Sequence, residues 1–246
     1  NAVTINDCAN VTLAIGASPV MTSDPNEVEE MVAHAGALVL NVGTLNSQTV
    51  ESMLRAGARA AKLNIPIVLD PVGVGATALR TEAVRRIMAA MPLTVIRGNM
   101  SEIKIIANSA EGIRGVDSTA SAEGGEEIAR ELSKLSGAVV AITGAVDIVS
   151  DGERVCRIHN GHPMLRSVTG TGCMATALIG SCAATGARLE AAVTGLAVMG
   201  LAGEIAYRNL RPNEGDGLGM FRVRLIDAIS NITEKDVELC KIQLEN

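Results

Sequence analysis

The sequence predicts one α/β domain, with a mostly parallel central sheet flanked by helices and a helical C-terminal third. Short apolar runs of strand length alternate with longer segments of helical period. The chain has 246 residues with one Tyr, one Phe and no Trp. Val, Ile, Leu, Ala and Met must therefore fill the core, as is typical of buried parallel strands. No internal repeat or linker-like segment interrupts the pattern, so we expect a single domain over residues 1–246.

Four apolar runs are expected to form the parallel part of the sheet. They are Ala37–Val42, Pro66–Asp70, Leu93–Arg97 and Ala138–Thr143. The helical patterns between them cover Ser47–Leu63, Thr81–Met91 and Gly125–Leu135. Because strands and helices alternate, right-handed crossovers should place these strands parallel to one another.

After the fourth expected parallel strand, the sequence pattern no longer alternates between strands and helices. The Asp151-Gly152 turn is expected to join two antiparallel strands, Val146–Ser150 and Arg154–His159. Beyond them the pattern is almost wholly helical, with segments over Gly172–Thr185, Leu189–Asn209 and Leu218–Ile229. A last helix should begin at Thr233, where a capping residue is followed by acids in the first turn.

Composition argues against several classes of function. A net charge of −6 and two aromatic rings give little means of binding a phosphate backbone or stacking bases, so we expect no nucleic-acid partner. The five cysteines contain no C-x-x-C pair, which favours a reducing, cytoplasmic location. No uninterrupted apolar stretch has the length of a membrane span, and no membrane partner is expected. The chain begins at Asn1 without a Met, so we expect that a short N-terminal segment is missing.

Polar or glycine-rich sequence follows each of the four expected parallel strands. In open α/β sheets, ligands bind beyond the carboxyl ends of the strands. These ends should therefore meet in a crevice that is rich in hydrogen-bond donors and holds one Arg and one Asp. The four ends are Asn41-Val42-Gly43-Thr44, Asp70-Pro71-Val72-Gly73, Arg97-Gly98-Asn99 and Thr143-Gly144.

A glycine loop, Thr169-Gly170-Thr171-Gly172-Cys173, opens the first C-terminal helix. The free N–H groups and the dipole of a helix N-terminus form an anion site, which a transferred phosphoryl group can use. Cys173 in the first turn can accept a proton from a hydroxyl, act as a neutral contact, or be a small buried apolar residue. The loop and Gly73–Ala78 both fit G-x-G-x-x-G/A, a weak match in either context, and the chain has no Walker A sequence.

Two carboxylates accompany this loop. Glu102 lies three residues after Asn99 at a strand end, and Asp70 ends the neighbouring strand. Magnesium takes one or two protein carboxylates beside phosphate oxygens, so Glu102 and Asp70 together satisfy its demand. Each also has a structural interpretation, Glu102 as a helix N-terminal acid and Asp70 as a turn cap.

Together these motifs resemble the ribokinase-like superfamily and, within it, the hydroxyethylthiazole kinase family. The resemblance runs in order from Asn1 to the helix after Cys173. The motifs that carry it are Asn1-Ala2-Val3-Thr4 with Asn6-Asp7, Ala17-Ser18-Pro19-Val20-Met21, Leu40-Asn41-Val42-Gly43-Thr44-Leu45, Asp70-Pro71-Val72-Gly73-Val74-Gly75-Ala76-Thr77, Ile96-Arg97-Gly98-Asn99, Ala141-Ile142-Thr143-Gly144, His159-Asn160-Gly161-His162 and Val168-Thr169-Gly170-Thr171-Gly172-Cys173.

The resemblance implies ATP-dependent, magnesium-requiring phosphorylation of the hydroxyl of hydroxyethylthiazole, in thiamine biosynthesis or salvage. It also implies a homotrimer with sites between subunits. Cys173 stands where most ribokinase-like proteins have a catalytic Asp, which leaves the identity of the base open. The implied substrate contacts are Met21, Asn1, Gly43 and Gly170. The nucleotide contacts are Arg97, Thr143, Asn99 and Gly172, with Asn99 and Glu102 at the magnesium–phosphate end.

Two other functions remain open from sequence alone. One is another ribokinase-like kinase, acting on a hydroxymethylpyrimidine or a sugar, against which Cys173 and the Ala17–Met21 segment argue. The other is a nucleotide-binding module without turnover, which would have little need of both carboxylates and the anion loop. His159 and His162 can suggest a metal pair, but a turn or packing role is favoured because no acid cluster is nearby.

Overall fold

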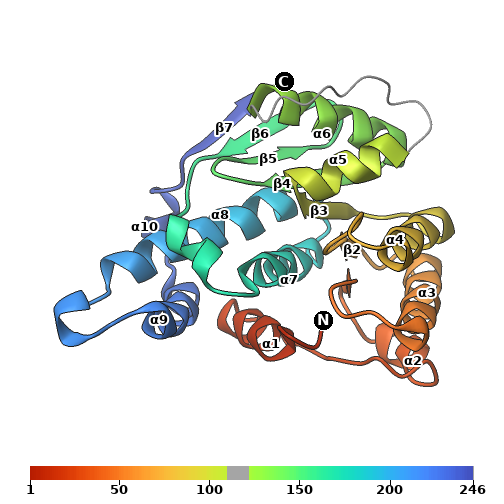
Figure 1. Ribbon diagram of the computed structural model, residues 1–246, viewed down its shortest axis with the longest axis horizontal. Coiled ribbons are helices and arrows are strands. Elements are labelled where there is room, and N and C mark those ends of the chain that lie inside the picture. The colour runs from red at the N-terminus through yellow and green to blue at the C-terminus, as the bar shows by residue number, and fades with distance from the viewer. Residues whose placement is uncertain (110–121, 246) are drawn as a thin grey trace.

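The computed structural model describes residues 1–109 and 122–245, and Figure 1 shows the arrangement of their elements. The strands are β1 (Leu38–Asn41), β2 (Ile67–Asp70), β3 (Val95–Asn99), β4 (Val139–Thr143), β5 (Asp147–Ser150), β6 (Val155–Ile158) and β7 (Ile242–Glu245). The helices are α1 (Ile5–Ala14), α2 (Val28–Val32), α3 (Ser47–Lys62), α4 (Ala78–Ala90), α5 (Met100–Ser109), α6 (Ala122–Ser136), α7 (Thr171–Ala183), α8 (Arg188–Arg208), α9 (Leu218–Asn231) and α10 (Glu234–Val237), with short 3₁₀ turns η1 (Pro163–Ser167) and η2 (Pro212–Glu214).

The seven strands of this part of the chain form one sheet in the order β1-β2-β3-β4-β5-β6-β7. Strands β1 to β4 pair in parallel, and β5 to β7 continue the sheet antiparallel. The four expected parallel strands and the hairpin are therefore confirmed. Because β1 to β4 are parallel, their carboxyl ends lie at one edge of the sheet, and Asn41 is paired directly with Asp70 there.

The sheet gains an edge strand, β7, that the sequence pattern did not predict. It pairs with β6 through Cys156 and Leu244, and all four of its residues are exposed. An exposed four-residue strand buries no apolar face, so its sequence carries no clear strand signal.

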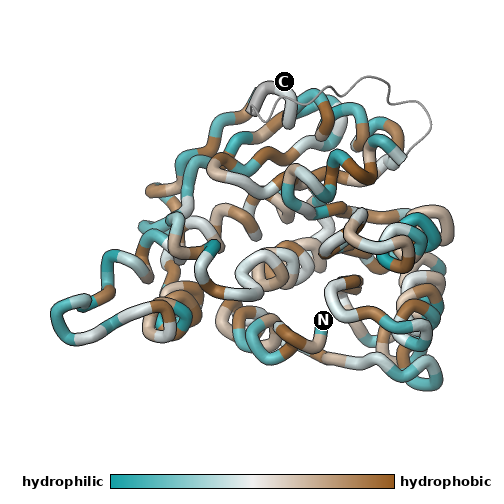
Figure 2. The backbone as a smooth tube through the Cα atoms, in the orientation of Figure 1, coloured by the Kyte–Doolittle hydropathy of each residue, from teal (hydrophilic) through white to brown (hydrophobic). Residues whose placement is uncertain are grey.

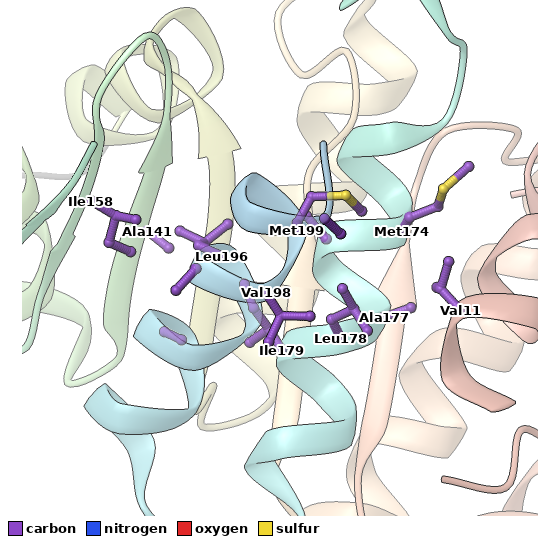
Figure 3. Close-up of a cluster of buried hydrophobic side chains, with 14 of the residues drawn as sticks. Val11, Ala141, Ile158, Met174, Ala177, Leu178, Ile179, Leu196, Val198 and Met199 are labelled. Atoms are coloured by element: carbon purple, nitrogen blue, oxygen red, sulfur yellow. The ribbon is translucent and has the colours of Figure 1, made fainter. Parts of the chain in front are cut away.

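Two hydrophobic clusters cover the two faces of the sheet. Alternate residues of β4 illustrate this, since Val139 and Ala141 belong to one cluster and Val140 and Ile142 to the other. The first cluster lies under α1, α7, α8 and α9 and includes the fully buried Phe221. In Figure 3 the side chains of α7 lie between Val11 of α1 and the side chains of α8. The second cluster lies under α2 to α6.

The helices differ in polarity according to their place. α3 and α4 alternate hydrophilic and hydrophobic residues along the tube in Figure 2, as expected of helices with one solvated side. α7 has no charged residue. Within the described residues, α8 is the one helix with the length and composition of a membrane span, but 72% of its apolar window is buried inside the protein. It is therefore a core helix of the fold.

Helix ends follow local capping chemistry. α3 begins after Asn46, whose side chain accepts from the Thr49 N–H while the Thr49 hydroxyl accepts from the Asn46 N–H. The last helix is capped at Thr233 as expected. α1 and α2 were not predicted, because their few buried residues form no regular stripe.

Candidate active site

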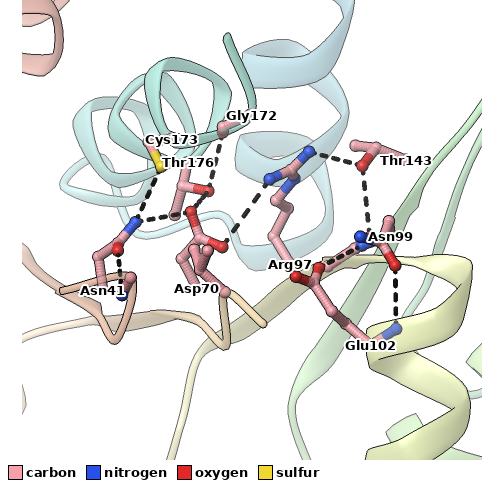
Figure 4. Close-up of polar contacts among 12 residues, drawn as sticks. Asn41, Asp70, Arg97, Asn99, Glu102, Thr143, Gly172, Cys173 and Thr176 are labelled. Atoms are coloured by element: carbon pink, nitrogen blue, oxygen red, sulfur yellow. Dashed lines mark hydrogen bonds and ion pairs between the residues drawn. The ribbon is translucent and has the colours of Figure 1, made fainter. Parts of the chain in front are cut away.

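The site lies where the carboxyl ends of β1 to β4 meet the first turn of α7, which packs on β1 and β2. Figure 4 shows the polar residues that converge there. Most of the residues selected from the sequence are brought together. They are Asp70, Arg97, Asn99, Glu102, Thr143, Gly172 and Cys173, with Asn1, Gly43 and Gly170 beside them.

Two glycines allow α7 to approach its neighbours. Gly170 caps the helix with φ of 90°, in the left-handed region that favours glycine, and a Cβ there would lie 2.5 Å from Thr4 Cγ2. A Cβ on Gly172 would lie 2.7 Å from Arg97 Nη1. The guanidinium of Arg97 therefore lies directly against the backbone that opens α7.

Asp70 is the most deeply buried charged group of the site. It is 0% exposed, and its Oδ2 accepts from Asn41 Nδ2 and Thr176 Oγ1, both at 2.9 Å. Its Oδ1 has no hydrogen-bond partner and lies 3.8 Å from Arg97 Nη1. Burial raises the pKa of Asp70, while the charge of Arg97 and the hydrogen bond from Thr176 act in the opposite direction.

Arg97 supplies the positive charge of the crevice. Its side chain is 11% exposed, and its Nη2 donates to Thr143 Oγ1 at 2.6 Å. Its Nε is buried without a hydrogen-bond partner. A buried guanidinium with unused donors is suited to an anionic ligand such as a phosphate chain.

Glu102 connects two loops of the site. Its Oε1 accepts from the Gly73 N–H and its Oε2 from the Asn99 N–H, each at 2.8 Å. The Glu102 N–H donates in return to Asn99 Oδ1 at 3.0 Å. Glu102 is thus a helix N-terminal acid, as one interpretation held, but it also holds the loop that follows Asp70.

Cys173 lies in the first turn of α7 with 8% of its surface exposed. Its Sγ accepts from Asn41 Nδ2 at 3.2 Å and from Asn1 Nδ2 at 3.5 Å. Gly43 lies against Asn1, since a Cβ on Gly43 would be 2.1 Å from Asn1 Nδ2. The sulfur is therefore surrounded by amide donors from distant parts of the chain.

Met21 is placed differently from the other selected residues. It belongs to the segment between α1 and α2, and its side chain is 44% exposed. No hydrogen bond, ion pair or core contact among the described residues joins this segment to Cys173.

The two histidines have turn and packing contacts. His162 Nδ1 accepts from the Met164 N–H, and the His162 ring stacks on Tyr207. His159 Nε2 lies 3.2 Å from Gln243 Oε1.

Three residues of the site were missed. Asn41 has no role among the sequence-based expectations, although its place at the end of a strand is a usable signal. Thr176 follows Cys173 by three positions on α7, so helical spacing could have indicated it. Arg80 donates through Nη1 to Val42 O and Val72 O, both at 2.8 Å, and through Nη2 to Gly43 O at 2.7 Å. An Arg on α4 has no sequence feature that distinguishes it from a solvated one.

Comparison with known proteins gives concordant results. The model of the hydroxyethylthiazole kinase family matches residues 1–235. The hydroxyethylthiazole kinase of Alkaliphilus oremlandii is 53% identical over 239 residues, which are 96% of this chain and 88% of that one. That of Ruminiclostridium cellulolyticum is 48% identical over 238 residues, 95% of this chain and 86% of that one.

Solved structures agree with the sequence comparison. The hydroxyethylthiazole kinase protein of Pyrococcus horikoshii superposes with a TM-score of 0.91 at 38% identity, over 100% of this chain and 91% of that one. The ADP complex of Bacillus subtilis pyridoxal kinase superposes with a TM-score of 0.55 at 19% identity, over 78% of this chain and 82% of that one, which shows a common fold.

Proposed function

Because this chain belongs to the hydroxyethylthiazole kinase family, we propose how its residues are assigned to the steps of that family's reaction. The chain is an ATP-dependent kinase of the thiamine pathway that phosphorylates hydroxyethylthiazole. The family match and the similar structure thus confirm the resemblance found in the sequence. The other acceptors and the module without turnover are thereby set aside. The assignments below extend this activity to individual residues.

The reaction joins the hydroxyl oxygen of the thiazole alcohol to the γ-phosphorus of ATP. The bond from that phosphorus to the β–γ bridging oxygen breaks, ADP leaves with the electron pair, and the hydroxyl proton passes to a base. Such a transfer is accelerated mainly by positioning and by stabilisation of charge. One observation carries the assignment: the opening of α7, the Arg97 guanidinium and the Asp70 carboxylate all meet at one point.

We assign the nucleotide end of the site to Arg97, Thr143, Asn99 and Gly172. The backbone N–H groups at the start of α7 and the guanidinium beside them can together bind the oxygens of the transferred group. Thr143 holds the guanidinium in place through its hydroxyl. Arg97→Met is expected to raise KM for ATP at least about tenfold, while KM for the thiazole alcohol changes little. An unchanged KM for ATP would contradict this assignment.

We assign the hydroxyl end to Cys173, with Asn1, Gly43 and Gly170 around it. The sulfur accepts hydrogen bonds from two amides, so it is an acceptor within the site. A hydroxyl that approaches Cys173 can donate its hydrogen toward the same atom. We propose that Cys173, in its thiolate form, accepts the substrate proton and becomes the neutral thiol, with the buried Asp70 carboxyl beside it.

The residues present fit a magnesium ion. Asp70 Oδ1 is buried and lacks a hydrogen-bond partner, and Glu102 is a second carboxylate that keeps one lone pair on each oxygen beyond its two backbone bonds. We propose that Asp70 and Glu102 hold the ion, with phosphate oxygens and water completing its ligands. When bound, magnesium neutralises charge on the transferred phosphate.

We further propose a homotrimer in which Met21 reaches the site of a neighbouring subunit. Exposed apolar side chains lie just before α1, on α1, on the segment after it and on α9, and α1 and α9 contact each other. They are Val3, Ile5, Leu13, Val20, Met21, Leu218, Met220 and Val223. Such a surface is suited to a subunit interface. The exposure of Met21 within its own subunit supports a contact made in the neighbour's site.

Mixing two variants, each impaired at a different residue, tests this arrangement. Met21→Glu lacks the substrate contact and Cys173→Ala lacks the proposed proton acceptor. If the site is shared, subunits exchanged between them restore activity in a fraction of sites, and light scattering gives the mass of three chains. If Met21 acts within its own subunit, the mixture gains no activity over the separate variants. A cytoplasmic location and one domain over residues 1–246 remain part of the proposal, supported by five free thiols and one continuous sheet.

A further inference from the structure

Asn41, the last residue of β1, lies between the two groups assigned to the chemistry. Its Nδ2 donates to Asp70 Oδ2 at 2.9 Å and to Cys173 Sγ at 3.2 Å. Its Oδ1 accepts from the Gly43 N–H at 2.9 Å. Both hydrogens of the amide nitrogen are therefore in use.

The orientation of this carboxamide follows from its neighbours. The Gly43 N–H can only donate, so the group that faces it must be the amide oxygen. A carboxamide turned by 180° would place its oxygen against the Asp70 carboxylate and its NH₂ against the Gly43 N–H. A Cβ on Gly43 would lie 2.9 Å from Asn41 Oδ1, so the loop packs closely against the amide.

On the Asp70 side, Asn41 restricts the carboxylate. Oδ2 accepts from Asn41 and from Thr176, both at 2.9 Å, so the carboxylate cannot rotate without losing two hydrogen bonds. Its other oxygen, Oδ1, is thereby kept on the side of Arg97, 3.8 Å from Nη1 and without a hydrogen-bond partner. The direction in which the free oxygen of this buried carboxylate points is therefore determined by Asn41 on β1 and Thr176 on α7.

On the Cys173 side, Asn41 fixes the place of the sulfur. A thiol is a weak acceptor on a freely rotating bond, and two amide donors at 3.2 and 3.5 Å select one rotamer for it. Of these two donors, only Asn41 also contacts Asp70. Asn41 thus connects the sulfur to the carboxylate, in addition to the side-chain hydrogen bond between Cys173 and Asp70 themselves.

We propose that Asn41 is a positioning residue for phosphoryl transfer, whose carboxamide holds the Cys173 sulfur and the Asp70 carboxylate at a fixed separation around the acceptor hydroxyl. This inference rests on the proposed role of Cys173. The most similar polar side chains do not reproduce the bridge: Asp has no N–H to donate, Ser is too short to reach both groups, and Gln is longer by one methylene. Misplacement of reacting groups by about 1 Å can cost about 100-fold in rate.

A double-mutant cycle tests the proposal. Asn41→Ala, Cys173→Ala and the double variant are compared by ADP release, with kcat and both KM values measured for each. Asn46→Ala is the matched control, since Asn46 also accepts from a backbone N–H but only caps α3. We expect Asn41→Ala to lose about 10- to 100-fold in kcat with KM for ATP within about threefold, and Asn46→Ala to keep its kcat.

The double variant shows whether Asn41 acts through Cys173 or independently of it. If Asn41 acts through the sulfur, Asn41→Ala costs much less in the Cys173→Ala background than in the wild type. The proposal is overturned if Asn41→Ala keeps its kcat, or if the two losses simply multiply while Cys173→Ala is itself impaired. If Cys173→Ala keeps full activity, the proposed role of Cys173 fails and this inference fails with it. Should Asn41→Ala not fold by circular dichroism, Asn41→Ser replaces it in the same cycle.

Discussion

Removal of the Arg80 side chain should loosen two loops of the site at once. The guanidinium donates to three carbonyl groups, at Val42, Gly43 and Val72, over 2.7–2.8 Å. A hydrogen bond that involves a charged group contributes about 1.5–3 kcal/mol, and these are partly buried, so water replaces them in part. For Arg80→Ala we therefore expect a loss of about 3 kcal/mol in the free energy of unfolding.

Arg85 on the same helix supplies the control. It forms an ion pair with Glu82 at 2.8 Å, and its side chain is 67% exposed. Exposed pairs of this kind contribute about 0.2–1 kcal/mol. Urea titration of Arg80→Ala, Arg80→Lys and Arg85→Ala should rank the first as least stable. Lys is expected to be intermediate, because one ammonium group cannot reach all three carbonyls in the fork geometry of Arg.

Activity adds a second measurement. Gly43 contacts Asn1, and Val72 precedes the Gly73 N–H that Glu102 holds. Arg80→Ala should therefore raise KM for the thiazole alcohol and lower kcat at temperatures where the variant is still folded. Equal unfolding free energies for Arg80→Ala and Arg85→Ala, together with unchanged kinetics, would refute the assignment of Arg80 as a loop support.

Three further predictions concern single carboxylates and the thiol. Glu102→Gln replaces one acceptor oxygen by an NH₂ group that faces a backbone N–H. The magnesium concentration that gives half-maximal activity should therefore rise about 10- to 100-fold. An unchanged magnesium titration would show that Glu102 is not a ligand of the ion. Burial raises the pKa of Asp147 from its ordinary 3.8 to about 6, so the native state is favoured when this group is protonated and loses that stability as the pH rises from 3.8 to 6. In Asp147→Asn the amide oxygen can still accept from the Gly144 N–H. The free energy of unfolding of this variant should therefore rise relative to that of the wild type between pH 4 and pH 7, by at most about 3 kcal/mol. A difference in unfolding free energy that does not vary with pH would contradict this. Cys173→Asp should retain or raise kcat, since a carboxylate is a better base at neutral pH and can accept the same amide hydrogen bonds; a loss of several orders of magnitude would mean that the thiol itself is needed.

The part of the fold that is predictable from the sequence is the part with a strong local signal. The four parallel strands are buried apolar runs, and the polar residues that follow them had to meet at one edge of the sheet. Asp70, Arg97 and Thr143 were found for that reason. The helices α3 and α8 were found from length and periodicity.

The remainder depends on contacts between distant segments. Arg80 is a support only because α4 lies beside two loops, and Asn41 is a bridge only because α7 brings Cys173 to the end of β1. The dual role of Glu102 depends in the same way on the loop at Gly73. Met21 illustrates a different limit, because its proposed partner belongs to another subunit.

The hydrogen bonds to the Cys173 sulfur have a consequence for how the protein is made. The donors on Asn1 and Asn41 are 172 and 132 positions away along the chain. Domains generally begin to form as the chain leaves the ribosome, and contacts of long sequence separation form late. The hydrogen bonds from Asn1 and Asn41 to the sulfur therefore cannot form until α7 has been synthesised and has docked on β1 and β2. During refolding, catalytic activity should consequently return after the helical signal, as a reporter of the last long-range contacts to close.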